Sequence, residues 1–397
     1  MRNIVIILFA VGFYCYRSPY FRKVDPVEYS LNLPAKLDGH LSPNELLDAT
    51  ERLHENALHW PESFAVLNNK IYTGLGDGRI VEVSGKKITD VTRIGSDCAG
   101  QHEEHICGRP LGMTFNKAGL LYVADAYHGI FTVDVKTGKK NNILPSKTVV
   151  DGLPLFLLNN IALDEKEQAL YISQSSTKWN LSHVIVSFME HESSGRLLKF
   201  DLKTKGVTVL LKDLSFPNGV ELTHDGSAVL VAECFKNSIF KYFIQGPKKG
   251  TKTVLPVVFP GEPDNISRNK RGTYWVALAG ARSLEKPSLG DNLAGKPLVR
   301  RAILYIHKVL TAPIANLMQY LPYDWAKDTA FELGTARIIA DHIVDSGAVV
   351  EFDDNGKIIK FIHSPTGKVS HLSEALEHNG HLYLGSWRNH YIGKLKL

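Results

Sequence analysis

The sequence predicts an all-β fold, a six-bladed β-propeller, on three observations. Short apolar stretches rich in Val, Ile, Tyr and Phe follow one another from about residue 48 to the C-terminus. Gly, Asp and Asn residues separate them, as turns between strands require. Strand-rich units recur about every 45–60 residues, a period typical of propellers, and six such units fit into the 397 residues. The clearest strands are Lys70–Leu75, Leu120–Asp125, Ala169–Ser173, Ala228–Glu233, Thr273–Ala277 and His381–Gly385.

Composition and charge narrow the range of functions. The chain is 44% hydrophobic and 22% charged, which is ordinary for a folded protein with a large core. Its net charge of +5 comes from short, scattered pairs of basic residues. A nucleic-acid surface would need dense basic clusters with interleaved aromatic residues, and the sequence has none. We therefore expect no nucleic-acid partner.

Residues Asn3–Tyr16 form an uncharged apolar run between Arg2 and Arg17. The run is shorter than the roughly 20 residues of a bilayer-spanning helix, but nearby tyrosines could sit at the headgroups and extend it. No small-residue cleavage site follows, which favours an uncleaved signal anchor over a cleaved signal peptide. More basic residues follow the run than precede it, and by the positive-inside rule this argues weakly against a lumenal C-terminus. The expected domains are a membrane anchor over residues 1–20, a stem over 21–47 and the propeller over 48–397.

One region departs from the strand pattern. Residues 297–321 have apolar side chains at helical spacing, which predicts one or two amphipathic helices. They fall within an insertion of about 283–343 in the fifth blade. The helices could form a cap packed on the propeller face. Alternatively, they could lie on a membrane surface, an interpretation that Arg300, Arg301 and Lys308 favour.

Two features bear on the compartment. Cys98 and Cys107 bracket a polar loop that a disulfide could close. The alternative, a metal site with His102 and His105, lacks the CxxC-type spacing of known zinc sites. A disulfide would imply an oxidising compartment, which fits the N-terminal signal. Asn180 begins a glycosylation sequon, Asn-Leu-Ser.

The innermost strand of each unit should run along the central tunnel, so that the first residues of these strands meet near the axis. By spacing, Leu111 takes this position in the second unit and His371 in the sixth. In the other units a carboxylate or an amide takes it, and such oxygen ligands suit Ca²⁺, whereas zinc would need His or Cys. Asn and Asp often bond their own backbone in turns, but their recurrence in phase favours a metal. The expected ligands are Glu62, Asn159, Asn218, Asp264 and Asn265.

At these positions the chain resembles the adipocyte plasma membrane-associated protein group of the strictosidine synthase-like propellers. Their wider relatives are the paraoxonases, the gluconolactonases and the squid-type phosphotriesterase. The resemblance covers almost everything after the stem. It is carried by Gly108–Gly112, Leu121–Tyr127, Gly195–Leu198, Phe216–Gly219, Pro263–Ile266 and Glu377–Gly385.

The resemblance implies a calcium ion at the tunnel mouth, held by residues that correspond to the same five ligands. It also implies a disulfide between Cys98 and Cys107. Finally, it implies a signal-anchored, glycosylated, single-pass type II membrane protein whose propeller faces the endoplasmic reticulum lumen or the cell exterior. This outweighs the argument from the flanking charges.

Departures from the family pattern bear on activity. Paraoxonases carry a catalytic His where this chain has Leu111, and leucine cannot transfer protons. Acidic residues that hold a second calcium in paraoxonases correspond to Ser63 and Asn160 here, so we expect no second ion. The alkaloid synthase has a Glu where this chain has Ser373, so we do not expect its amine–aldehyde condensation.

The resemblance and the oxygen ligands together predict a calcium-dependent hydrolase of the arylesterase or lactonase type. Its substrate would be a small hydrophobic ester or lactone, with Ca²⁺ polarising a carbonyl or phosphoryl oxygen. His371 could act as general base, or Asp264 could attack directly. The alternative is a non-catalytic, membrane-anchored binding or scaffold propeller whose calcium is structural.

Overall fold

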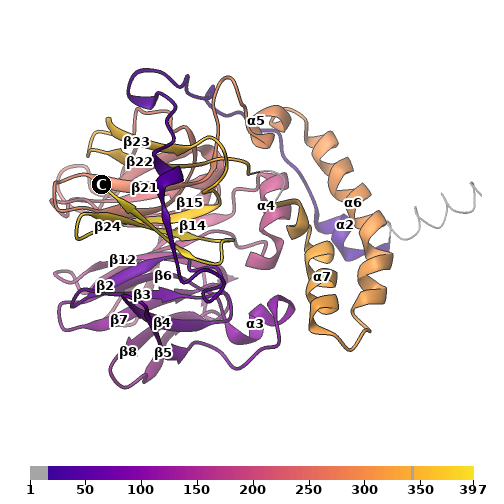
Figure 1. Ribbon diagram of the computed structural model, residues 1–397, viewed down its shortest axis with the longest axis horizontal. Coiled ribbons are helices and arrows are strands. Elements are labelled where there is room, and N and C mark those ends of the chain that lie inside the picture. The colour runs from indigo at the N-terminus through magenta and orange to yellow at the C-terminus, as the bar shows by residue number, and fades with distance from the viewer. Residues whose placement is uncertain (1–16, 341–343) are drawn as a thin grey trace, which may run out of the picture.

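The computed structural model describes residues 17–340 and 344–397. Within them the chain forms six four-stranded antiparallel sheets and a two-stranded ribbon, in a propeller-type arrangement (Figure 1). In chain order, four sheets comprise β2–β5 (Phe64–Leu67, Lys70–Gly74, Arg79–Ser84, Lys87–Arg93), β6–β9 (Pro110–Phe115, Leu120–Asp125, Gly129–Asp134, Lys140–Pro145), β12–β15 (Leu158–Asp164, Ala169–Gln174, Gly195–Asp201, Val207–Leu214) and β16–β19 (Pro217–Leu222, Ala228–Glu233, Ser238–Phe243, Lys252–Val254). The fifth comprises β20–β23 (Gly261–Arg268, Tyr274–Ala281, Gly347–Phe352, Ile358–Ser364), and the sixth β24–β26 (Leu372–His378, His381–Ser386, Ile392–Lys396) with β1 (Glu51–Leu53). The ribbon is β10–β11 (Val149–Val150, Leu153–Pro154).

The sheets are held together by apolar clusters, each shared by two neighbouring sheets. For example, Tyr72 of the first sheet packs with Val123 of the second, and Leu230 of the fourth packs with Val350 of the fifth. Ile392 of the sixth sheet packs with Ile71 of the first. Since β1 pairs with β26, the sixth sheet also joins the two ends of the propeller chain. The same alternation of buried residues therefore repeats in every unit and explains the period of the sequence.

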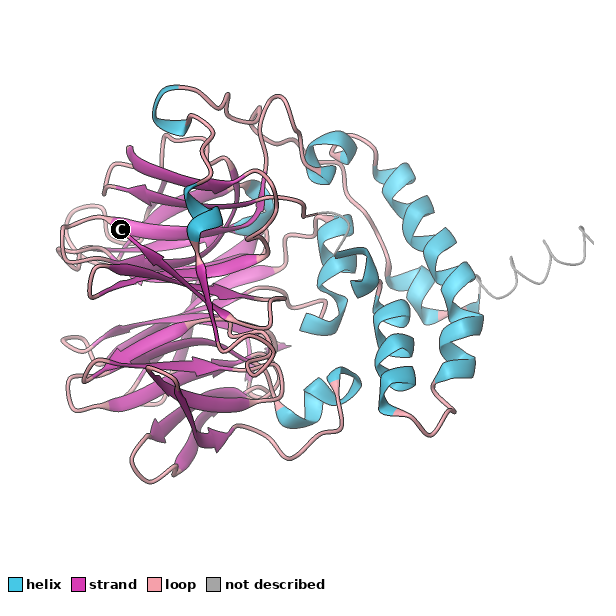
Figure 2. Ribbon diagram, in the orientation of Figure 1, coloured by secondary structure: helices cyan, strands magenta, loops and turns pink. Residues whose placement is uncertain are grey.

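Helices gather at one end of the sheets, as Figure 2 shows. Three of them, α5 (Leu289–Leu293), α6 (Pro297–Met318) and α7 (Asp324–Thr335), lie between β21 and β22. A further helix, α4 (Val184–Glu190), connects β13 to β14 and packs against α6. The short α2 (Pro19–Lys23) precedes the sheets, and α3 (Glu104–Cys107) precedes β6.

The helical region is more extensive than the sequence pattern predicts. Helix α6 continues through Pro313, although a proline inside a helix removes one backbone hydrogen bond. Helix α7 follows it, and the apolar spacing of residues 297–321 gave no sign of this second, more polar helix.

A disulfide closes the loop between Cys98 and Cys107, as the family resemblance implies. Cys98 and Cys107 are joined, with their Cα atoms 5.5 Å apart. The Nδ1 atom of His102 lies 2.7 Å from the Oδ1 atom of Asp328 in α7, so this imidazole contacts the helical region. The loop thereby ties the first two sheets to α7.

The expected membrane anchor falls mostly on residues 1–16, which lie outside the described residues. No helix in the described part of the chain is both long and apolar enough to cross a bilayer.

Candidate functional site

A β-bulge recurs near the start of the innermost strands. In five of them the pairing register shifts near this point, and in four of the five it shifts around the residue that the phase argument places on the axis. A bulge bends a strand and re-aims the side chains at that point. The shifts bracket Leu111, Asn159–Asn160, Asn218–Gly219, Asp264–Asn265 and Ser373.

This geometry corrects the assignment of the sixth position. A residue with left-handed backbone precedes the in-phase residue by two positions in several units: Trp60, Leu157 and Phe216 have φ of 56°, 53° and 53°. His371 has φ of 57° and is the counterpart of these turn residues, so the in-phase residue of the sixth unit is Ser373. Spacing alone could not find the two-residue offset, because the helical insertion obscures the length of the fifth unit.

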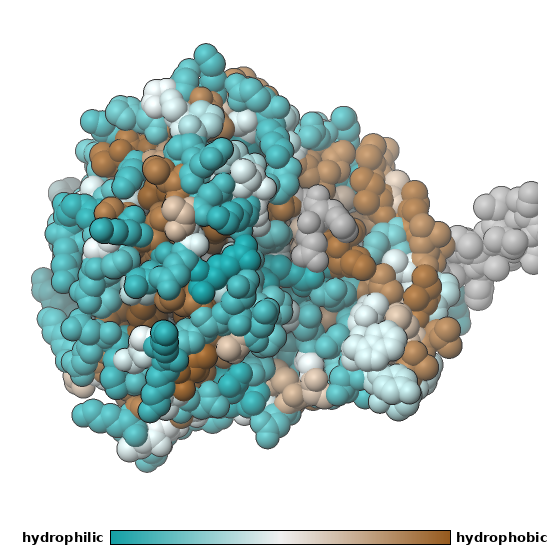
Figure 3. Space-filling view, in the orientation of Figure 1, coloured by the Kyte–Doolittle hydropathy of each residue, from teal (hydrophilic) through white to brown (hydrophobic). Residues whose placement is uncertain are grey.

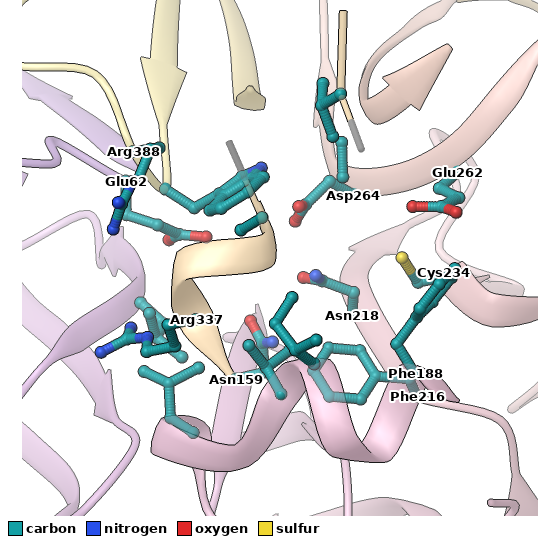
Figure 4. A pocket seen from close by; sticks show the side chains of 18 of the residues that line it. Glu62, Asn159, Phe188, Phe216, Asn218, Cys234, Glu262, Asp264, Arg337 and Arg388 are labelled. Atoms are coloured by element: carbon teal, nitrogen blue, oxygen red, sulfur yellow. The ribbon is translucent and has the colours of Figure 1, made fainter. Parts of the chain in front are cut away.

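Four of the five expected ligands line one cavity of about 130 Å³: Glu62, Asn159, Asn218 and Asp264. Figure 4 shows their side chains pointing toward one another, Glu62 from the segment before β2 and the other three from β12, β16 and β20. All four are nearly inaccessible to solvent, with exposed fractions of 3–4%.

Each of these four side chains has one buried oxygen with no hydrogen-bond partner: Glu62 Oε2, Asn159 Oδ1, Asn218 Oδ1 and Asp264 Oδ1. Buried polar atoms are nearly always paired, and an unpaired one costs roughly 1–3 kcal/mol. Four converging oxygens, two of them from carboxylates, form a donor set that fits Ca²⁺. A divalent cation would compensate all four at once.

The electrostatics of the cavity are consistent with this fit. Burial raises the pKa of Glu62 to about 8, although the guanidinium of Arg109 acts to lower it. Burial also holds the pKa of Asp264 well above its usual range, and the carboxyls of Glu62 and Glu374 raise it further. Two buried acids this close cannot both ionise at low cost unless a cation neutralises them.

Asn265 does not line the cavity as expected. Its side-chain oxygen accepts a hydrogen bond from Nδ2 of Asn160, and its own Nδ2 donates to Glu62 Oε1 over 3.3 Å. Asn265 therefore helps to orient Glu62 without itself lining the cavity. A single residue of register decides this, since Asp264 and Asn265 are adjacent on a bulged strand.

Relatives carry a proton-transfer group at the positions of Leu111 and Ser373, but neither residue can take that role here. Leu111 lines the cavity with an apolar side chain. Ser373 is buried and its Oγ donates to the carbonyl of Glu62 over 2.6 Å. His371 is not among the residues lining the cavity. Its ring packs against Trp387 and its Nδ1 lies 2.9 Å from Ser370 Oγ.

The walls of the cavity are mainly apolar. Helix α4 supplies Val184, Ile185 and Phe188, while Phe216 and Phe235 come from the fourth sheet and its loops. The amphipathic pattern of α4 spans only seven residues, too few for sequence analysis to detect it.

Four charged wall residues, Arg109, Glu262, Arg337 and Arg388, were also not anticipated. Glu262 lies two residues before Asp264 on β20, and burial raises its pKa to about 7. Arg109, which is fully buried, donates to the carbonyl of Trp60 over 2.8 Å. Arg337 pairs with Glu104 over 3.0 Å. Alternation along β20 places Glu262 on the same side of the strand as Asp264, which is the sequence signal that could have found it.

Comparison with known proteins identifies the family. A strictosidine synthase-like N-terminal model matches residues 39–83, and a strictosidine synthase model matches residues 159–247. Adipocyte plasma membrane-associated protein of Salmo salar is 35% identical over 396 residues, covering 99% of this chain and 88% of that one. The protein of the same name from Gallus gallus is 35% identical over 376 residues, covering 94% and 84%. The chain belongs to the adipocyte plasma membrane-associated protein family.

A solved structure of another protein supports the propeller-type fold of this member of the adipocyte plasma membrane-associated protein family. A gluconolactonase from Xanthomonas campestris aligns with a TM-score of 0.54 at 12% identity, covering 94% of this chain and 96% of that one. The matched strictosidine synthase segment begins at Asn159 and includes Asn218, so two of the cavity oxygens lie within it.

Proposed function

We propose that this chain is a calcium-dependent hydrolase of the arylesterase or lactonase type. The observation that supports it most directly is the convergence of four unpaired buried oxygens in one apolar cavity. The gluconolactonase with the same fold makes a lactone a reasonable first substrate class.

Glu62, Asn159, Asn218 and Asp264 would hold the ion through these oxygens. A calcium ion bound there would polarise a carbonyl or phosphoryl oxygen of the substrate. The apolar wall formed by Phe188, Phe216 and Phe235 would bind the hydrophobic part of the substrate and exclude bulk water.

Asp264 is the residue that we assign to the reacting atoms. Its carboxylate lines the cavity, and the oxygen that does not hold the ion could attack the ester carbonyl, expelling the alcohol and leaving an acyl-enzyme that water then hydrolyses to the acid. A bound cation would favour the ionised form of Asp264, whose pKa is raised by burial and by the neighbouring carboxyls of Glu62 and Glu374.

A second candidate function is a binding or scaffold propeller whose calcium is structural. The observation that favours it is that no histidine is among the described residues lining the cavity, so no imidazole is present there to act as base.

The two functions are distinguished by following the full chain in detergent, with calcium and then with chelator. Hydrolysis of phenyl esters and lactones, thermal unfolding, and terbium luminescence excited through Trp60 would be measured together. If the chain is the proposed hydrolase, chelation and Asn218→Ala should each abolish hydrolysis, lower the melting temperature and abolish terbium luminescence. The exposed control Asn355→Ala should leave all three unchanged. Calcium-dependent stability and terbium binding without any turnover would support the scaffold, and no response to chelator would rule out the metal site.

We also propose that the N-terminal apolar run anchors the chain as a single-pass type II protein with the propeller in the endoplasmic reticulum lumen or outside the cell. The relatives are named as plasma membrane-associated proteins, and Asn180 is exposed and thus accessible to glycosylation. Protection of the propeller from protease in sealed microsomes, with an endoglycosidase-sensitive mass shift lost in Asn180→Gln, would support this topology. Digestion of the propeller in intact microsomes would contradict it.

A further inference from the structure

Helix α6 carries an apolar stripe on its outer side. Val299, Ile306, Leu310 and Leu317 recur at helical spacing along it, and Leu310 and Leu317 expose 66% and 69% of their surface. Figure 3 shows this stripe as a continuous hydrophobic band along the edge of the molecule farthest from the sheets. Soluble surfaces rarely leave so long an apolar band uncovered.

The outer side of α6 carries no charge. Every residue that α6 leaves exposed is uncharged, and Asn316 alone among them has a polar side chain. The basic residues that favour a membrane surface in the sequence analysis are buried or have partners within the protein. Arg300 is buried, Arg301 pairs with Asp25, and Lys308 donates to the carbonyl of Gly334 over 2.9 Å. Any partner of this face must therefore be apolar rather than anionic.

The inner side of α6 is committed to the protein. Leu304 is fully buried in a cluster with Val186 and Met189 of α4, and Ala312 is buried as well. A helix with one face packed on a domain and the other apolar and exposed lies parallel to whatever covers it.

The N-terminal stem runs directly against α6. The rings of Phe21 and Tyr305 lie 4.5 Å apart, and the Tyr305 hydroxyl donates to the Phe21 carbonyl over 2.6 Å. In the sequence, the apolar run Asn3–Tyr16 ends just before Arg17. The chain that leaves this run is therefore held beside the exposed stripe, as α2 and α6 in Figure 1 show.

Aromatic residues cluster where α6 meets α7. Tyr320, Tyr323 and Trp325 expose 83%, 55% and 61% of their surface, and the last two rings stack 6.1 Å apart. Tyr and Trp prefer the headgroup level of a bilayer, where the ring is sheltered and the polar atom stays hydrated.

We propose that the outer face of α6, with Tyr320, Tyr323 and Trp325, lies in the boundary between headgroups and acyl chains of a phospholipid bilayer. The apolar stripe enters the boundary and the aromatic residues mark its edge. Because the exposed residues of α6 are uncharged, binding depends on apolar burial and does not require anionic lipid.

The test uses the full chain reconstituted into zwitterionic phosphatidylcholine vesicles with bromines at shallow or deep acyl positions. Bromine quenches nearby tryptophan, and residues 1–16 contain none. Of the five tryptophans, Trp60, Trp179 and Trp275 are buried and Trp387 lines the cavity. We expect shallow bromines to lower the emission by about a fifth, the share of one interfacial tryptophan in five. Trp325→Phe should abolish this quenching, and neither salt nor anionic lipid should change it.

Two further variants give the control. Leu310→Glu with Leu317→Glu should reduce the quenching of Trp325 at least twofold, while the exposed Val254→Glu on β19 should leave it unchanged. A particle that doubles in mass with concentration would show that a second copy covers the face and overturn the proposal. Unquenched Trp325 in a monomer would mean that residues 1–16 or solvent cover it, which also overturns the proposal. Quenching that needs anionic lipid would contradict the uncharged mode of binding.

Discussion

The unpaired oxygen of Asn159 offers the sharpest test of the metal at the scale of one residue. Its Nδ2 donates to Ser175 Oγ over 3.0 Å; when Asn159 is replaced, Ser175 loses this donor but its hydroxyl still donates to the carbonyl of Pro217. Without an ion, Asn159→Leu removes a buried unpaired oxygen at little cost and should leave the chain as stable or stabilise it by about 1 kcal/mol. With an ion, it removes a ligand.

We therefore expect Asn159→Leu to lower the melting temperature in calcium and to leave it unchanged or raise it in chelator. The measurement is thermal unfolding of the full chain in both conditions, with wild type alongside. The same effect with and without calcium would mean that Asn159 is not a ligand.

His191 should make the folding stability of the protein depend on pH. It is buried, its ring stacks on Tyr29 with centroids 3.4 Å apart, and burial beside Arg300 lowers its pKa to about 3. The unfolded chain takes up a proton near pH 6.5 that the folded chain refuses, so stability falls as pH drops below about 6.5. Between pH 7 and pH 5 this single group should cost about 2 kcal/mol.

Asn suits the left-handed backbone of this position, where φ is 53°. His191→Asn should therefore flatten the dependence of unfolding free energy on pH over that interval, measured by denaturant titration. An unchanged slope would place the titrating group elsewhere.

At the scale of single residues, the sequence predicted the cavity-lining positions that recur from unit to unit. It could not predict those for which a shift of one or two residues decides whether the side chain faces the cavity. Glu62, Asn159, Asn218 and Asp264 could be predicted to meet because a carboxylate or an amide recurs in phase in successive units. His371 and Asn265 are not among the residues lining the cavity, because a shift of one or two residues turns a side chain from the cavity to its surroundings.

Arg300 links four segments at the scale of elements. Its guanidinium donates to the carbonyl of Met189 in α4 over 2.7 Å, to Leu293 and Ala294 at the end of α5, and to Val27 in the stem. A buried cation with several acceptors is costly to remove, because each carbonyl then loses its donor.

We expect Arg300→Met to destabilise the helical region by about 3 kcal/mol or more and to expose the stem to protease. The neighbouring Arg301→Met breaks only a partly exposed pair with Asp25 and should cost less than about 1 kcal/mol. Limited proteolysis and denaturant unfolding of both variants provide the comparison. Equal effects would show that Arg300 does not hold the segments together.

Strands proved easier to predict than helices because each strand alternates over a core that every unit repeats. Helix α6 was recognised by its apolar spacing, but its charged residues could not be placed, since Arg300 points into the protein and Arg301 does not. Helix α7 is held by tertiary contacts such as that of Asp328 with His102, which leave no periodic signal.

At the scale of the whole molecule, the α6 face and the cavity lie on the same side of the sheets. Helix α4 packs against α6 with one side and lines the cavity with Val184, Ile185 and Phe188. A bilayer under α6 would therefore bring membrane-dissolved esters or lactones close to the apolar wall of the site. This expectation depends on both the proposed hydrolase and the proposed membrane face.

Leu310→Glu with Leu317→Glu should consequently slow hydrolysis of a long-chain ester embedded in phosphatidylcholine vesicles, roughly tenfold, because the site is displaced from the bilayer. The same variant should hydrolyse a short, water-soluble phenyl ester at the wild-type rate, since neither leucine lines the cavity. Both rates would be measured on the full chain with calcium. No hydrolysis of either ester by wild type would count against the enzyme. An equal loss of activity on both esters in the variant would indicate a damaged fold. If the variant hydrolysed both esters at the wild-type rate, α6 would not deliver substrate from the membrane.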